Sequence, residues 1–161
     1  MTKEERDLLV KDLCARLPYG VKVACLGDSD HTWYNLESID ITDNEVYITN
    51  YEPENSYHGY VNIEIIRPYL FPMSSLTKED LKSLFTAMYS DATEIKVTYT
   101  EGEDYYEIEV KYGHYTNYFN SDNLLNDINY IGYDWLNSRH YDYRDLIGKK
   151  LAKSAVNLNI Y

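Results

Sequence analysis

The amino-acid sequence predicts an α+β fold, with a mostly antiparallel sheet of about five to seven strands, three main helices and a short C-terminal helix. Three observations support this prediction. Segments in which apolar and polar residues alternate are interleaved with segments of helical periodicity. Turn residues separate them, and no repeat, low-complexity tract or linker interrupts the chain. With 161 residues, 44% of them apolar, the chain is expected to form a single domain over residues 1–161.

Two of the predicted helices begin with a capping box, in which a threonine and the acid three residues later each bond the other's backbone amide. Thr2 and Glu5 open the first helix, and Pro18 ends it. Thr77 and Asp80 open the second helix, whose apolar stripe is expected to face the core. The stripe consists of Leu81, Leu84, Phe85 and Met88.

The stretch before the second helix is unusual in its prolines. Alternation over residues 61–65 predicts a strand. Residues 68–72, PYLFP, predict a stiff loop, because each proline fixes its own φ and keeps the preceding residue extended. The apolar residues of this loop are expected to point inward.

The remaining elements follow from the same periodicities. A third helix is predicted over 122–136, and a turn with a short last helix over 140–155. Residues 52–59 are expected to form a polar loop. Further strands are predicted over 21–26, 33–41, 45–50, 95–99 and 108–112, with a short one ending at Phe119.

Cysteine usage and the N-terminus indicate a cytoplasmic location. Cys14 and Cys25 are not arranged in a disulfide or zinc pattern, so two free thiols are expected, with Cys14 as a buried small apolar residue. The N-terminus has no signal-peptide core, and no apolar run approaches the ~18 residues of a membrane span.

Charge is unevenly distributed over a chain whose net charge is −12. Residues 23–66 contain nine acids and no Lys or Arg, and residues 91–134 contain ten acids and two lysines. Non-specific nucleic-acid binding is not expected, because phosphates would be repelled. A partner protein with a basic surface would be attracted instead, although solubility alone also explains many acidic proteins.

Tyrosine is unusually frequent, with 19 residues against 3 Phe and 2 Trp. Tyrosine covers apolar surface while its hydroxyl stays in water, which suits protein recognition and equally suits the outer face of a thin sheet. Acid and tyrosine coincide over 28–60 and 103–118. The candidate interaction surface comprises Asp28, Asp30, Tyr47, Tyr51, Tyr57, Tyr60, Tyr105, Tyr106, Tyr112 and Tyr115.

No motif indicates catalysis, a metal site or a cofactor, so a non-enzyme without cofactor is expected. Asp28, Asp30 and His31 could ligate a cation but are also common turn residues. The segment 140–145 (HYDYRD) could offer a base, an orienting carboxylate and an anion clamp, or could form a structural turn. The candidate anion pocket comprises Arg67, His140 and Arg144.

Three segments, 8–23, 65–77 and 134–152, resemble an uncharacterised family of small acidic proteins from gut Bacteroidales and their phages and mobile elements. The resemblance spans the chain and implies no activity and no catalytic residues. It also implies that glycine is more usual where this chain has Asp145. The sequence favours a non-catalytic interaction protein, such as an inhibitor or immunity-type binder of a basic partner. The alternative is a binder of a small ligand or nucleotide signal, with tyrosines stacking the base and arginines holding phosphate.

Overall fold

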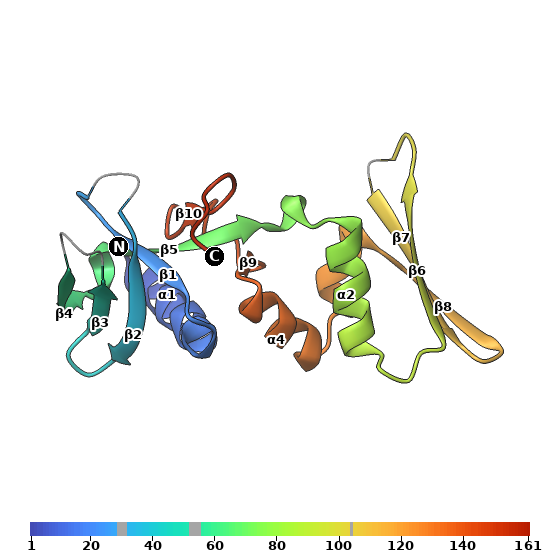
Figure 1. Cartoon of the computed structure of the whole chain (residues 1–161), viewed down its shortest axis with the longest axis horizontal. Helices are drawn as coiled ribbons and strands as arrows, with labels where there is room; N and C mark the ends of the chain where they lie inside the picture. Colours follow the sequence, from blue (N-terminus) through green and yellow to red (C-terminus); the bar gives the residue numbers. More distant parts are fainter. Residues whose placement is uncertain (29–31, 52–55, 104) are drawn as a thin grey trace. The chain divides into compact units, whose positions relative to one another are not determined.

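The chain has the predicted α+β class, with 33% helix and 36% strand. The computed structural model describes residues 1–28, 32–51, 56–103 and 105–161. The chain forms two compact units (Figure 1). Unit 1 consists of Met1–Met73 and His140–Tyr161, and unit 2 consists of Ser74–Arg139. The single domain over 1–161 stays a prediction.

Unit 1 is built on a mixed sheet with the strand order β10-β5-β1-β2-β3-β4, in which β9 also pairs with β5. Strands β9 and β10 run parallel to β5, and the other pairs are antiparallel. The strands are β1 (Lys22–Cys25), β2 (Tyr34–Asp40), β3 (Glu45–Asn50), β4 (Tyr57–Asn62), β5 (Ile66–Pro72), β9 (Tyr141–Asp142) and β10 (Lys153–Ser154). The strands predicted near 21–26, 33–41 and 45–50 are confirmed as β1, β2 and β3.

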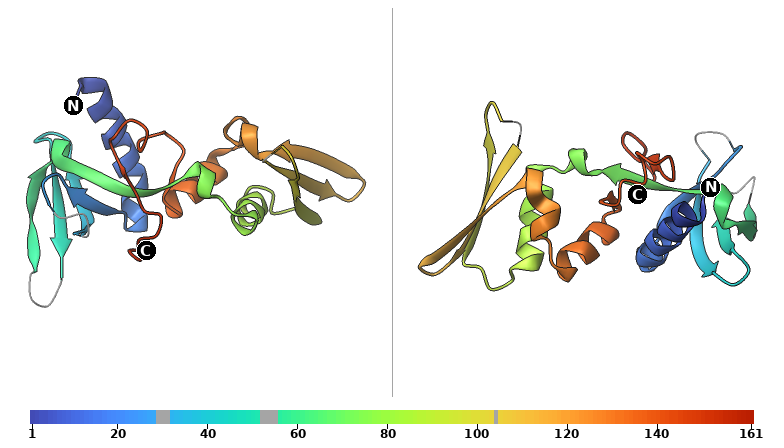
Figure 2. Two further views of the ribbon diagram at one scale, coloured as in Figure 1. Left: turned by 90° about the horizontal axis from the view of Figure 1, so that it is seen from above. Right: turned by 180° about the vertical axis from the view of Figure 1, so that it is seen from behind.

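Helix α1 (Lys3–Arg16) lies beside this sheet, as the views in Figure 2 show, and packs on it through Leu9 and Leu13. Leu9 and Leu13 are fully buried and join a core cluster with apolar residues of β1, β2, β3 and β5. The capping box of Thr2 and Glu5 is confirmed. Cys14, predicted to be buried, is exposed, because it lies on the side of α1 away from that cluster.

The stiff loop predicted over 68–72 is wrong, because these residues belong to β5. The extended geometry that proline imposes on its neighbour is also strand geometry, so PYLFP pairs as a strand. Three partners share β5 along its length, first β1, then β10 and finally β9. Tyr69 and Leu70 are buried, so the predicted inward direction is confirmed.

The segment before β5 also differs from the prediction. Strand β4 begins at Tyr57, inside the predicted polar loop, because its backbone pairs with β3. The strand predicted over 61–65 ends at Asn62, whose side chain accepts a bond from the Glu64 amide and starts the 3-10 turn Ile63–Ile65.

The short last helix predicted within 140–155 is also wrong, because residues 143–150 form turns. The Asp142 carboxylate accepts bonds from the backbone amides of Leu146 and Ile147, at 2.8 and 2.7 Å, and holds the chain in a turn. Asp145 has a left-handed backbone with φ 57°, a conformation that glycine adopts without strain. Leu146 and Leu151 are buried.

Unit 2 packs helices against a three-stranded antiparallel sheet of order β6-β7-β8. Its elements are α2 (Lys78–Met88), β6 (Glu94–Thr100), β7 (Tyr105–Tyr112), β8 (Tyr115–Asn120), α3 (Leu124–Asp127) and α4 (Tyr130–Ser138). The capping box of Thr77 and Asp80 is confirmed, and so is the buried stripe of α2. The predicted third helix breaks into α3 and α4, because the Asn129 side chain caps α4 at the amides of Ile131 and Gly132.

Candidate functional site

The outer face of the unit 2 sheet carries a row of ionisable and aromatic side chains. Side chains alternate along β7, so Tyr105, Glu107, Glu109 and Lys111 share one face. The intervening Ile108 and Val110 are buried against the rest of unit 2, where they join the core. This outer face is therefore available for contact with another molecule.

The charges at one end of this face are compensated. The Lys111 ammonium lies 2.7 Å from the Glu94 carboxylate and 3.8 Å from that of Glu109. Lys96 lies 3.9 Å from Glu109 on its other side. Acid and base therefore alternate across β6 and β7 at this end, and an incoming cation would gain little there.

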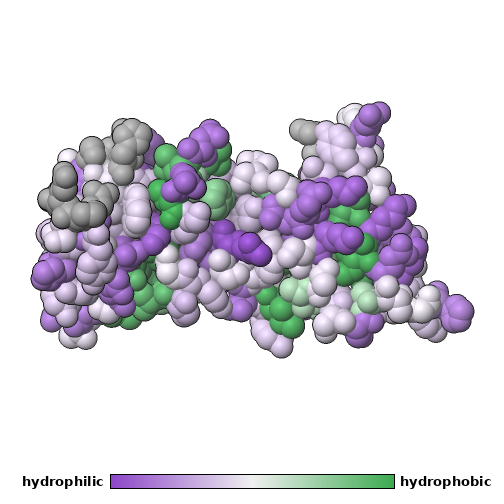
Figure 3. Space-filling view, in the orientation of Figure 1, coloured by the Kyte–Doolittle hydropathy of each residue, from purple (hydrophilic) through white to green (hydrophobic). Residues whose placement is uncertain are grey.

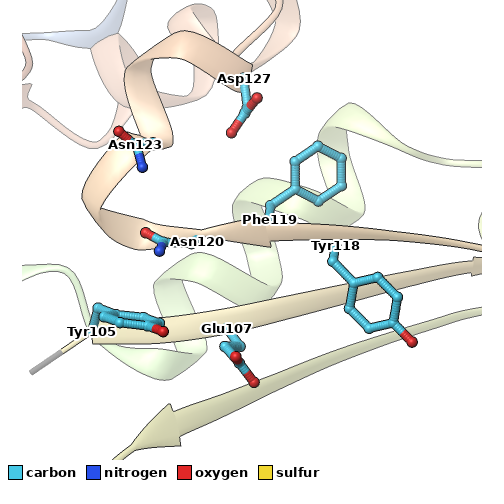
Figure 4. A pocket seen from close by; sticks show the side chains of 7 residues that line it. All are labelled: Tyr105, Glu107, Tyr118, Phe119, Asn120, Asn123 and Asp127. Atoms are coloured by element: carbon cyan, nitrogen blue, oxygen red, sulfur yellow. The ribbon is translucent and has the colours of Figure 1, made fainter. Parts of the chain in front are cut away.

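A pocket of about 380 Å³ lies at the other end of the sheet (Figure 4), where it takes Glu107 and Tyr118 from the outer face and Phe119 from the buried face. Its lining residues come from β7, β8 and the turn and short helix that follow β8. They are Tyr105, Glu107, Tyr118, Phe119, Asn120, Asn123 and Asp127. Glu107 and Asp127 are both exposed, and neither is in an ion pair within the described ranges. The pocket therefore combines two free carboxylates with aromatic rings and amides.

Three local contacts hold the lining in place. The Ser121 hydroxyl accepts a bond of 2.9 Å from the Tyr106 amide and fixes the end of β8 to β7. The Asn120 side chain accepts a bond of 2.7 Å from the Asp122 amide, which starts the 3-10 turn leading to α3. The Phe119 ring packs 5.1 Å from that of Phe85 in α2. These contacts fix the backbone at the end of β8 and the turn that follows it, from which Asn120 and Asn123 come.

Tyr105 remains neutral at physiological pH. Its hydrogen bond with Glu103, together with burial and the nearby charge of Glu107, raises the pKa of Tyr105 to about 12. An uncharged phenol presents an electron-rich ring face, and such faces attract cations when a carboxylate stands beside them. A site of this kind is suited to binding an arginine or a lysine side chain.

A second hollow in unit 2 is lined by residues of α2 and by Trp135 of α4. Figure 3 shows hydrophilic residues with hydrophobic ones among them over α2. The lining of the hollow mixes one acid, one lysine, small polar residues and Trp135. The Trp135 indole donates a bond of 3.3 Å to Ser83. Its charges balance, so it is a weaker candidate than the pocket at β8.

The predicted interaction surface is divided between the two units. Unit 2 holds four of its tyrosines, and only Tyr105 lines the pocket. Tyr106 and Tyr112 lie on the opposite face of β7 from Tyr105, where their rings contact those of Tyr99 and Tyr89. Tyr115 pairs with Tyr112 on that face and is 81% exposed.

Unit 1 holds the other predicted surface tyrosines. Tyr47 and Tyr60 are cross-strand neighbours, with ring centroids 5.0 Å apart. The Tyr57 ring lies 5.6 Å from that of Tyr34. The Tyr34 hydroxyl in turn donates a bond of 2.9 Å to the Asp28 carboxylate. Tyr51 is exposed, and Asp30 and His31 lie outside the described residues.

The two arginines of the candidate anion pocket are already bonded within unit 1, and its histidine is buried there. The Arg67 guanidinium donates to the carbonyls of Glu64, Ile66 and Lys150. Arg144 pairs with Asp12, and His140 is only 5% exposed and stacks on the Tyr161 ring. Asp142 bonds turn amides rather than orienting His140.

Sequence reasoning did not single out Glu107, Asn123 or Asp127. Alternation along β7 could have placed Glu107 beside Tyr105. Asn123 and Asp127 reach the pocket only because the turn after β8 packs on β7, and no sequence period reports that contact.

No family model, curated protein or solved structure matches the chain. None of the helices in the described parts of the chain has the length and apolarity that a membrane span requires. The chemistry of the pocket at β8 therefore carries the functional argument.

Proposed function

We propose that this chain is a non-catalytic cytoplasmic interaction protein, an inhibitor or immunity-type binder, that engages a basic partner protein through the pocket at β8. Its origin in gut Bacteroidales or their phages and mobile elements is part of the same proposal. The observation that carries it is the presence of two free carboxylates, Glu107 and Asp127, in one pocket with the half-buried ring of Tyr105 and the exposed ring of Tyr118.

A single basic side chain in this pocket supplies a modest affinity. A cation over an aromatic face contributes about 0.5–1 kcal/mol at an exposed site. A carboxylate at ~4 Å adds ~1 kcal/mol in a water-like surrounding and ~4 kcal/mol in a protein-surface dielectric. The net charge of −12 adds long-range attraction that steers a basic partner and weakens with salt.

The test uses a small defined ligand, a blocked tripeptide with one arginine between two glycines. Titration into isotopically labelled protein is expected to shift the backbone resonances around Glu107, Tyr118 and Asn123. The shifts should shrink as ionic strength rises, because salt screens exposed charges.

Two variants of β7 make the test specific. Glu107→Gln removes a free carboxylate of the pocket and is expected to abolish the shifts. Glu109→Gln removes the same charge two residues away on the same face, where Lys96 and Lys111 already compensate it. That control should still bind. Equal binding by wild type and Glu107→Gln would contradict the proposal.

A further inference from the structure

Strand β8 is an edge of the unit 2 sheet. It pairs with β7 through an uninterrupted register from Tyr112–Tyr115 to Glu107–Asn120, without a bulge. In the described part of the chain β7 is its one strand partner, because the order of the sheet is β6-β7-β8. On the side of β8 away from β7, the main-chain N–H and C=O groups are therefore not hydrogen-bonded to another strand of the described residues.

The hairpin geometry shows which main-chain groups these are. A two-residue turn joins β7 to β8, and its closing pair, Tyr112 and Tyr115, exchanges both hydrogen bonds. Bonding alternates from there, so Thr116 and Tyr118 direct their N–H and C=O groups away from β7. The hydrogen bond from the Tyr106 amide to the Ser121 hydroxyl agrees with this alternation, because it indicates that the even-numbered residues of β7 direct their main-chain groups toward β8.

The free edge lacks the features that normally prevent pairing. Natural edge strands are protected by lysine, proline, bulges or inward charges. β8 reads YTNYFN, with no charged residue and no proline, although the chain carries a net charge of −12. Tyr115 and Tyr118 are 81% and 73% exposed. Such an edge is suited to receiving another strand.

We propose that β8 accepts an extended basic segment of the partner protein as an added strand. This proposal rests on the proposed function, because the pocket at β8 then receives one basic side chain of that segment. Tyr118, Phe119 and Asn120 belong to the edge and the pocket at once, so a strand beside them reaches both. Main-chain bonds to Thr116 and Tyr118 supply the affinity that a single side chain lacks.

The charge of the surroundings selects the occupant. Glu107, on the neighbouring strand β7, and Asp127, in α3, both line the pocket at β8 without a compensating cation in the described ranges, so they attract a basic segment. A second copy of this chain would bring another −12 to the contact and is disfavoured. Alternate residues of the added strand face the acidic side of the sheet, which predicts basic residues at every second position.

The test uses a short blocked peptide of alternating arginine and threonine. Thr116→Pro removes an N–H that points to the free edge, and Thr116→Ala keeps it while losing the same hydroxyl. The Kd of the peptide is expected to rise at least about tenfold in Thr116→Pro and to stay within about twofold in Thr116→Ala. Equal affinity for the two variants overturns strand addition.

The single-arginine tripeptide separates this proposal from the proposed function. Thr116→Pro should still bind it, which also shows that the variant is folded. In one outcome, Glu107→Gln no longer binds the tripeptide, while Thr116→Pro and Thr116→Ala bind the long peptide equally. That outcome supports the proposed function of the pocket and overturns the added strand. Tripeptide binding unchanged in Glu107→Gln overturns both.

Two further measurements cover the remaining outcomes. If Thr116→Pro does not fold, peptides methylated at alternate backbone nitrogens decide the question, because methylation of the bonding set should abolish binding by wild type and methylation of the other set should not. Sedimentation of the protein alone should show no dimer. A dimer that Thr116→Pro dissolves would make a second copy the occupant and overturn the basic segment.

Discussion

The buried carboxylate of Asp12 offers the sharpest test of how unit 1 is held together. Asp12 and Arg16 are both 0% exposed and lie one turn apart on α1. The Arg16 guanidinium donates to the two carboxylate oxygens at 2.7 and 3.0 Å and to the Tyr141 carbonyl at 2.7 Å. Arg144 adds a third bond to Asp12 at 2.6 Å.

Asp12→Ala is expected to destabilise unit 1 severely. The substitution leaves the Arg16 guanidinium buried without a counter-charge, and breaking such a pair costs about 3–5 kcal/mol. Asp7→Ala is the matched control on the same helix, because Asp7 is exposed and lies 3.6 Å from Arg6 at the surface. Exposed pairs contribute less than about 1 kcal/mol, so this control should unfold almost as wild type does.

Urea unfolding followed by tryptophan fluorescence measures the difference. Unit 1 contains Trp33 and unit 2 contains Trp135, and the chain has 2 tryptophans. In a Trp135→Phe background the signal therefore reports unit 1. A free energy of unfolding that falls equally in Asp12→Ala and Asp7→Ala would refute the reasoning, because the pair would then behave as a solvated one.

Two further predictions follow from buried positions in the two units. Burial, with a smaller contribution from the Arg16 charge, lowers the pKa of His140 from its ordinary value of 6.5 to about 4. The unfolded state then binds the proton more readily, so unit 1 should lose up to about 3 kcal/mol of stability as pH falls from ~6.5 to ~4. Urea midpoints across this range should show a slope that His140→Asn flattens, and an unchanged slope would count against a buried neutral imidazole. In unit 2, a Cβ at Gly132 would lie 2.7 Å from both Met88 Sδ and Ile128 Cγ2. Gly132→Ala should therefore cost about 1–3 kcal/mol in Trp135-monitored unfolding, and no loss would mean that Met88 moves aside freely.

The elements that sequence reasoning predicted well are those fixed by local chemistry. Thr2 with Glu5, and Thr77 with Asp80, each form their capping box within four residues of chain. The hairpin of β6 and β7 also follows from alternation around a short turn. These signals need no partner from elsewhere in the chain, so one sequence is enough to find them.

The elements that were predicted wrongly depend on distant partners. Residues 68–72 form a strand because β1, β9 and β10 pair with them, and β9 and β10 come from residues beyond 140. Asp142 replaces the predicted last helix with turns by bonding two amides in the following chain. In the candidate site, Tyr105 was predicted, but Asp127 depended on how α3 packs near β8.

The pairing of β5 with β9 gives the chain an order of assembly. Unit 1 is made of chain segments that precede and follow unit 2 in the sequence. The hydrogen bond from Arg144 to Asp12 joins residues 132 positions apart. At ~5–20 residues per second, a ribosome needs roughly 4–16 s to move from residue 73 to residue 153. Hairpins close in about 1–10 μs, so the earlier strands of unit 1 have time to pair while β5 still lacks β9 and β10. Every residue of unit 2 has therefore been synthesised before β9 pairs with β5.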